Sequence, residues 1–239
     1  MRLYVLQMGL SPQTGSPIPA YLIQTDDGTN VLVDSGFPRA MIGAYKEPGY
    51  TGFAMDEEDY IVNRLAAIGV QPDEIGYVVC THFDPDHAGG HDSFPNAEFV
   101  VQRAQYEAAK SGQHDRFERM RPYWDAPGLR YREVDGDTEL LPGIELIESS
   151  GHVIGHQSVL IRLPQTGPVL LAIDAITRQL GDTAPEDRVA GPFDADEAGM
   201  RASTRKLVDL AAREGAALLI HGHDPAQWTT LRRSPQYYS

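Results

Sequence analysis

Metal-binding side chains crowd into one short stretch of this chain, residues 82–87, which reads His-Phe-Asp-Pro-Asp-His. Imidazole and carboxylate groups hold divalent first-row metal ions, and two close carboxylates repel one another unless a cation lies between them. The stretch follows the apolar run 75–80, and Pro85 and the pair Gly89-Gly90 interrupt regular structure around it. The sequence therefore predicts a metal site in a loop at the end of a buried strand.

Further candidate ligands follow three other predicted strands. His152 comes after the strand predicted at 144–149, Asp174 ends the strand at 169–173, and His223 comes after the strand at 217–220. Loops at strand ends, carried by a rigid sheet, are common positions for functional sites. We therefore expect four loops to converge and to hold two divalent metal ions with one bridging carboxylate. The candidate ligands are His82, Asp84, Asp86, His87, His152, Asp174 and His223.

Taken singly, the outlying residues have plainer interpretations. A lone histidine after a strand is more often a surface or core residue than a ligand, and Asp174 alone could be a turn residue. The dense cluster at 82–87 has no comparable structural purpose, and it carries the metal prediction by itself.

Periodicity predicts a mixed α/β chain built from two similar halves. We expect one domain over residues 1–239, with two sheets packed face to face and helices outside, a four-layer αββα sandwich. The polar segment 111–130, rich in arginine and aromatic residues, suits a lid or a subunit contact and leaves a homodimer open. Strands are predicted at 3–8, 20–24, 30–34, 76–80, 98–102, 131–134, 138–141, 144–149, 157–163, 169–173 and 217–220, and helices at 57–68, 103–110 and 194–214.

Charge narrows the choice of partners. The chain carries 20 Lys and Arg residues against 34 Asp and Glu, a formal net charge of −14. This balance argues against nucleic acid and anionic membrane surfaces, and it favours a small, neutral or weakly charged substrate. The single cysteine, Cys80, excludes an intramolecular disulfide. Residues 1–10 are typical of a strand rather than a signal peptide, and no segment approaches a membrane span, so we expect a cytoplasmic enzyme.

The order of these residues resembles that of the metallo-β-lactamase superfamily and, within it, the N-acyl-homoserine lactone lactonases. The superfamily pattern is His-x-His-x-Asp-His, then Gly-His, then Asp, then Gly-His-Asp. The likeness to the lactonases runs over most of the chain and is most specific at 101–109, Val-Gln-Arg-Ala-Gln-Tyr-Glu-Ala-Ala, and at 155–158, Gly-His-Gln-Ser. The resemblance implies the αββα fold and the opening of a lactone ring.

The resemblance also implies roles for individual residues. His82, position 84 and His152 would hold one metal ion, Asp86, His87 and His223 would hold the other, and Asp174 would bridge them. Zinc is the favoured metal. The metal ions would activate water to attack the lactone carbonyl, and Asp86 would pass a proton to the leaving alkoxide.

Two positions depart from the family pattern. Asp84 stands where the family has a histidine ligand, and an oxygen-richer ligand set shifts preference from zinc toward iron or manganese. Thr177 stands where the lactonases carry a tyrosine that helps to hold the substrate oxygen, and the shorter threonine would need a water to reach the same point.

The leading hypothesis is therefore a dinuclear metal-dependent hydrolase of N-acyl-homoserine lactones. Asp84 and Thr177 keep two alternatives open, namely a hydrolase of another ester, lactone or phosphoester, and a non-hydrolytic iron redox protein. Among the remaining residues, we expect His91 to be solvated and Asp224 to orient His223 or a neighbouring ligand.

Overall fold

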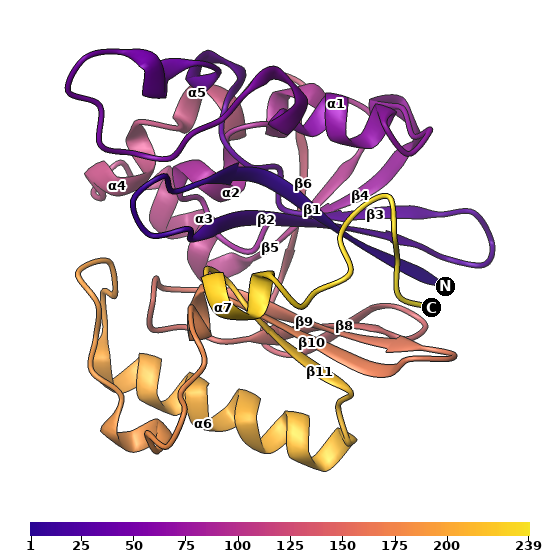
Figure 1. The fold of residues 1–239 in the computed structure, drawn as a ribbon, viewed down its shortest axis with the longest axis vertical. Helices are drawn as coiled ribbons and strands as arrows, with labels where there is room; N and C mark the ends of the chain where they lie inside the picture. The colour runs from indigo at the N-terminus through magenta and orange to yellow at the C-terminus, as the bar shows by residue number, and fades with distance from the viewer.

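The strands form two sheets. The computed structural model describes residues 1–239, and Figure 1 shows the sheets stacked one over the other. The six-stranded sheet has the order β1 (Arg2–Leu10), β2 (Pro17–Gln24), β3 (Asn30–Val33), β4 (Ile75–Val79), β5 (Glu98–Gln102) and β6 (Arg130–Val134). The five-stranded sheet has the order β11 (Leu218–His221), β10 (Gly167–Ile173), β9 (Gln157–Leu163), β8 (Ile144–Glu148) and β7 (Thr138–Leu141).

Helices cover the outer faces of both sheets. In Figure 1, α1 and α5 lie on the outer side of the first sheet and α6 lies on the outer side of the second. None of the helices combines the length and the apolar character needed to cross a membrane. The helices are α1 (Ile61–Ala66), α2 (Pro85–Ala88), α3 (Arg103–Lys110), α4 (Asp115–Glu118), α5 (Arg121–Trp124), α6 (Glu197–Glu214) and α7 (Pro225–Trp228).

Apolar side chains on both faces of the strands form three layers of hydrophobic core. Successive side chains of a strand point to opposite faces, so Val5 of β1 joins the core between the sheets while Leu6 joins the core beneath α1. The inter-sheet core contains 21 buried residues drawn from both sheets. On the far side of the second sheet, Leu207 and Leu210 of α6 pack with Leu170 of β10. The four-layer αββα prediction is confirmed.

Most predicted elements are present, and the differences have local causes. The helix predicted at 57–68 is split: a 3-10 turn with a capping box at Asp56 and Asp59 precedes α1, and Tyr60 between them has extended backbone. The helix predicted at 194–214 begins later, at Glu197, because the Asp196 side chain caps it by accepting a hydrogen bond from Ala198 N.

The topology carries the candidate ligands to strand ends. β3 and β4 are parallel neighbours in the first sheet, and β10 and β11 are parallel neighbours in the second. Parallel strands end at the same edge, so the segments after Val33 and Val79 lie together, as do those after Ile173 and His221. Packing the two sheets face to face brings these two pairs of loops to one place.

A substitution at Gly151 would measure how tightly the loop before His152 packs against α6. It has φ 136°, and a Cβ there would clash with the main chain of Met200. We expect Gly151→Ala to lower the free energy of unfolding by about 3 kcal/mol in urea denaturation. The matched control is Gly215→Ala, which has φ 61° and no atom within 4 Å of the new Cβ, and which should cost about 1 kcal/mol. Equal losses for the two variants would contradict the packing argument.

Candidate metal centre

Three side chains that follow strands of both sheets form a partly buried group, which we call the His223 cluster: Asp86, His87 and His223. His87 Nε2 lies 3.6 Å from Asp86 Oδ2 and 3.6 Å from Asp174 Oδ1. His223 Nε2 lies 3.7 Å from Asp86 Oδ2 and 3.0 Å from Asp174 Oδ1. His87 Nε2 and Asp174 Oδ1 are buried and make no hydrogen bond. Buried polar atoms that lack a hydrogen-bond partner and point toward one another are expected where a cation binds.

These spacings fit a metal ion. With metal–nitrogen and metal–oxygen bonds of about 2.0–2.1 Å, the ligand atoms of a tetrahedral zinc site lie about 3.3 Å apart. The separations of 3.0–3.7 Å in the His223 cluster bracket that value. The histidines and carboxylates of this cluster therefore suit a divalent first-row ion without rearrangement.

A second group, the Asp84 cluster, contains His82, Asp84 and His152. Asp84 Oδ2 lies 3.3 Å from both His82 Nε2 and His152 Nε2, and His152 Nε2 lies 3.4 Å from Asp174 Oδ2. Asp174 Oδ2 also lies 3.2 Å from His223 Nε2, so the Asp174 carboxylate stands between the two clusters, where a bridging ligand would lie. The structure brings together all seven candidate ligands.

Sequence reasoning missed one residue that reaches the Asp84 cluster. Arg116 of α4 donates to both carboxylate oxygens of Asp84, and its Nη2 lies 2.8 Å from His152 Nε2. The polar segment 111–130 left the position of Arg116 undetermined, because a helix as short as α4 has no periodicity to read. The available signal was the extra carboxylate at position 84, which calls for a nearby cation.

Each candidate histidine ligand is oriented through its other ring nitrogen. These Nδ1 atoms contact groups that lie behind the site, so Nε2 points inward. The partners are Thr81 Oγ1 for His82 at 3.0 Å, Asp34 Oδ2 for His87 at 2.8 Å, Asp194 Oδ1 for His152 at 2.9 Å and the Pro17 carbonyl for His223 at 2.8 Å.

Asp34 joins the ends of β3 and β4 beneath the site. Its buried carboxylate accepts from His87 Nδ1 and from the main-chain nitrogen and hydroxyl of Thr81, at 2.8–2.9 Å. Asp34 has φ 59°, and Ile173, just before Asp174, has φ 52°. Such conformations are costly for residues other than glycine, and they concentrate at functional sites. Positive φ at a strand end is not visible in sequence, which is why Asp34 was missed.

The carboxylates make the site attractive to cations. Burial lowers the pKa of His87, but the charges of Asp86, Asp174 and Asp34 outweigh it and raise that pKa to about 10. Burial likewise opposes the charge on His152, but hydrogen bonds to Asp194 and Asp84 raise its pKa to about 9. The Nη2 contact of Arg116 needs His152 Nε2 unprotonated, so the guanidinium, a proton and a metal ion compete for that nitrogen.

Some predicted neighbours lie elsewhere. The prediction that His91 is solvated is wrong, because its side chain is fully buried against Phe83 and Phe99. The Asp224 carboxylate makes no hydrogen bond to the His223 ring; it caps α7 by accepting from Ala226 N at 2.8 Å and Gln227 N at 3.0 Å. Thr177 is half-buried three residues after Asp174, and its carbonyl accepts from His223 N at 2.8 Å.

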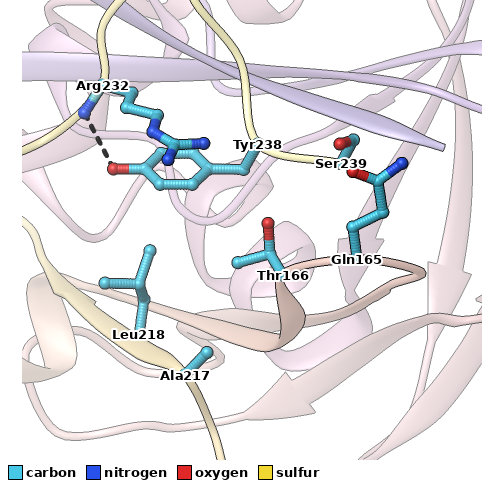
Figure 2. A pocket seen from close by; sticks show the side chains of 7 residues that line it. All are labelled: Gln165, Thr166, Ala217, Leu218, Arg232, Tyr238 and Ser239. Carbon is cyan, nitrogen blue, oxygen red and sulfur yellow. Dashed lines mark hydrogen bonds between the residues drawn. The ribbon is translucent and has the colours of Figure 1, made fainter.

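One hollow of the structure lies away from the candidate ligands. It has a volume of about 440 Å³ and lies beside the chain terminus, where Arg232 N donates to the Tyr238 hydroxyl (Figure 2). Its lining residues Thr166 and Leu218 stand at the beginnings of β10 and β11, whereas the candidate ligands follow the ends of those strands. This hollow therefore lies at the opposite end of the strands from the candidate ligands.

The fold has two stacked sheets between helices, and its histidines and aspartates converge from four strand ends. This combination defines a metal-dependent hydrolase. The sequence model described as Metallo-beta-lactamase superfamily matches residues 14–223. The chain belongs to the metallo-β-lactamase superfamily, whose members are typified by divalent metal centres.

Similarity extends to individual relatives. The chain is 36% identical to an N-acyl homoserine lactonase of a Bacillus species, over 92% of this chain and 86% of that protein. It is 35% identical to the N-acyl homoserine lactonase AttM of Rhizobium johnstonii, over 100% and 99%. A solved N-acyl homoserine lactone hydrolase, with the product N-hexanoyl-L-homoserine bound at its catalytic metal centre, superposes with a TM-score of 0.84 at 31% identity, covering 99% of this chain and 98% of that one.

Asp34 offers a test of how the ligands are held. Asp34→Asn keeps the shape of the side chain but removes the charge behind His87, and outer partners of this kind typically change metal affinity by about 10–100-fold. We expect zinc affinity, measured by competition with a chelating dye, to fall within that range. Asp27→Asn, at an exposed turn, is the control and should leave it unchanged. An unaltered affinity in Asp34→Asn would contradict the role assigned to Asp34.

Proposed function

We propose that this chain is a lactonase that opens the ring of an N-acyl homoserine lactone. The observation that carries the proposal is a set of three buried ligand atoms without a hydrogen bond, His82 Nε2, His87 Nε2 and Asp174 Oδ1, which lie among the other candidate ligands at the ends of β4 and β10. Relatives named as lactonases, aligned over nearly the whole chain, support the choice of substrate class.

The ligand assignment is part of the proposal. Asp86, His87, His223 and Asp174 would hold one metal ion, with zinc favoured. The Asp84 cluster is the candidate position for the second ion that the sequence predicts, and its carboxylate suits iron or manganese better than a third histidine would. A bound metal ion would supply Lewis-acid polarisation of a carbonyl and a lowered pKa for water.

Protein groups would handle the proton and the substrate. The Asp86 side chain is 18% exposed at the edge of the His223 cluster, so it can reach both the interior and a bound ligand. We assign it the transfer of a proton to the leaving alkoxide. Thr177 follows Asp174 and has a hydroxyl without a protein hydrogen bond, which suits contact with a substrate oxygen through a water.

Apolar surface beside the site suits an acyl chain. Ile154, two residues after His152, is 52% exposed, and Phe193, adjacent to Asp194, is 72% exposed. Asp194 itself holds His152, so both apolar side chains belong to loops that build the site. We assign Ile154 and Phe193 to contact with the acyl chain, since ligand sites combine apolar side chains with a few polar groups.

Asp84 and Thr177 support a second candidate, the hydrolysis of another ester, lactone or phosphoester. Both residues depart from the lactonase pattern at positions near the chemistry. A substrate panel separates the two candidates: faster turnover of linear esters or phosphoesters than of acyl homoserine lactones would favour the second. A homodimer and a cytoplasmic location stay predictions.

His87→Ala is the direct test of the lactonase proposal. Removing this imidazole leaves Asp34, Asp86 and Asp174 facing an incomplete site, so we expect hydrolysis of N-hexanoyl homoserine lactone to fall by about 100-fold or more. Hydrolysis is followed by acid release with a pH indicator.

The control is His114→Ala, an exposed histidine that lies outside both clusters. It should keep full activity. Lactone hydrolysis that survives in His87→Ala at the unmodified rate would rule out the proposed centre, and the absence of lactone hydrolysis in the unmodified chain would rule out the proposed substrate.

A further inference from the structure

We propose that the guanidinium of Arg116 takes the place of the second metal ion, so that the chain holds a single metal ion, in the His223 cluster. The inference rests on the proposed metal-dependent function and concerns how many metal ions serve it. It begins from the one substitution in the cluster pattern, Asp84, and from the arginine that contacts it, Arg116.

Arg116 is built into the Asp84 cluster by four contacts. Its Nε donates to Asp84 Oδ1 at 2.5 Å and its Nη2 donates to Asp84 Oδ2, which is the paired geometry in which a guanidinium binds a carboxylate most strongly. Nη2 also lies 2.8 Å from His152 Nε2, and Nη1 donates to the Phe193 carbonyl. The Arg116 side chain is 28% exposed, so this pair is largely withdrawn from water.

The guanidinium uses the atoms that a metal ion would need. A metal ion in the Asp84 cluster would be bound by His82 Nε2, His152 Nε2 and Asp174, with Asp84 Oδ2 as a further ligand. Nη2 of Arg116 contacts two of these atoms, Asp84 Oδ2 and His152 Nε2. Two cations cannot share those atoms at hydrogen-bond distance, since their repulsion in a poorly hydrated site is large. For the metal ion to bind, Arg116 would have to break its hydrogen bonds to both Asp84 and the Phe193 carbonyl.

Charge balance favours one metal ion as well. Asp84, Asp86 and Asp174 bring three negative charges into the centre, and one divalent ion with one guanidinium neutralises them. A histidine at position 84 would remove both the third charge and the partner of Arg116. Asp84 and Arg116 therefore make sense as a pair, since Arg116 forms no other ion pair.

The exchange changes what this half of the centre can do. A guanidinium stays protonated and donates hydrogen bonds from a fixed plane, so it can hold a carbonyl or carboxylate oxygen. It cannot lower the pKa of a water by direct coordination, as a metal ion does. Arg116 would then act as a positioning and charge-stabilising group, while activation of water stays with the His223 cluster.

The test counts metal ions instead of turnover. Metal-free protein is titrated with Co²⁺, the visible d–d absorption is followed, and bound metal is then measured by elemental mass spectrometry after gel filtration. We expect the unmodified chain to saturate at about one equivalent per chain, and Arg116→Met to take up about two, because the Asp84 cluster is freed. Asp84→His, which removes the carboxylate that holds Arg116, should also take up about two.

Arg119→Met is the matched control, since Arg119 lies on the same turn, is exposed and forms no ion pair; it should saturate like the unmodified chain. The first equivalent in each variant reports that the His223 cluster, and hence the fold, is intact. Two equivalents in the unmodified chain, or one equivalent in both Arg116→Met and Asp84→His, would overturn the inference. Neither result depends on lactone turnover, so this failure is distinct from failure of the proposed function.

Discussion

Like charges gathered in a buried space are the constraint on which this structure depends. Asp84 and Asp86 follow β4 and Asp174 follows β10; Asp84 and Asp174 are buried, and Asp86 is partly exposed. Carboxylates in such a place repel one another unless cations accompany them. The protein supplies part of that charge from its own chain, through Arg116, and its histidines leave unpartnered nitrogens for the rest. The charged residues at 82–87 are thus one half of the metal centre, and residues that follow the strands of the second sheet complete it.

The fold is suited to this purpose because both sheets end at the same place. Parallel pairing of β3 with β4 and of β10 with β11 aligns the strand ends, and the inter-sheet core holds the two edges together. The strained residues Asp34 and Ile173 lie at these ends, where the chain turns sharply enough to direct a carboxylate into the site. A packed sandwich can support such local strain, since its stability comes from the core elsewhere.

Much of this arrangement could be predicted from sequence, for a physical reason. Periodicity placed β9 and α3 at their observed bounds. Asp174 stands directly after an apolar run, and His82 and His223 follow one within three residues, which identifies strand ends. Contacts that cross between distant polar segments left no such trace. Arg116 sits in a four-residue helix without periodicity, and Asp34 depends on a backbone angle, so neither could be placed. His91 was misjudged because a histidine inside an aromatic core looks like any polar loop residue.

The central claim is that the strand-end ligands hold a metal ion. Anomalous diffraction from crystals grown with zinc, collected on both sides of the zinc absorption edge, tests it most directly. The account predicts a strong anomalous peak enclosed by Asp86, His87, Asp174 and His223, with ligand distances of about 2.0–2.2 Å. Zinc bound elsewhere on the molecule, with no peak among these four side chains, would contradict it.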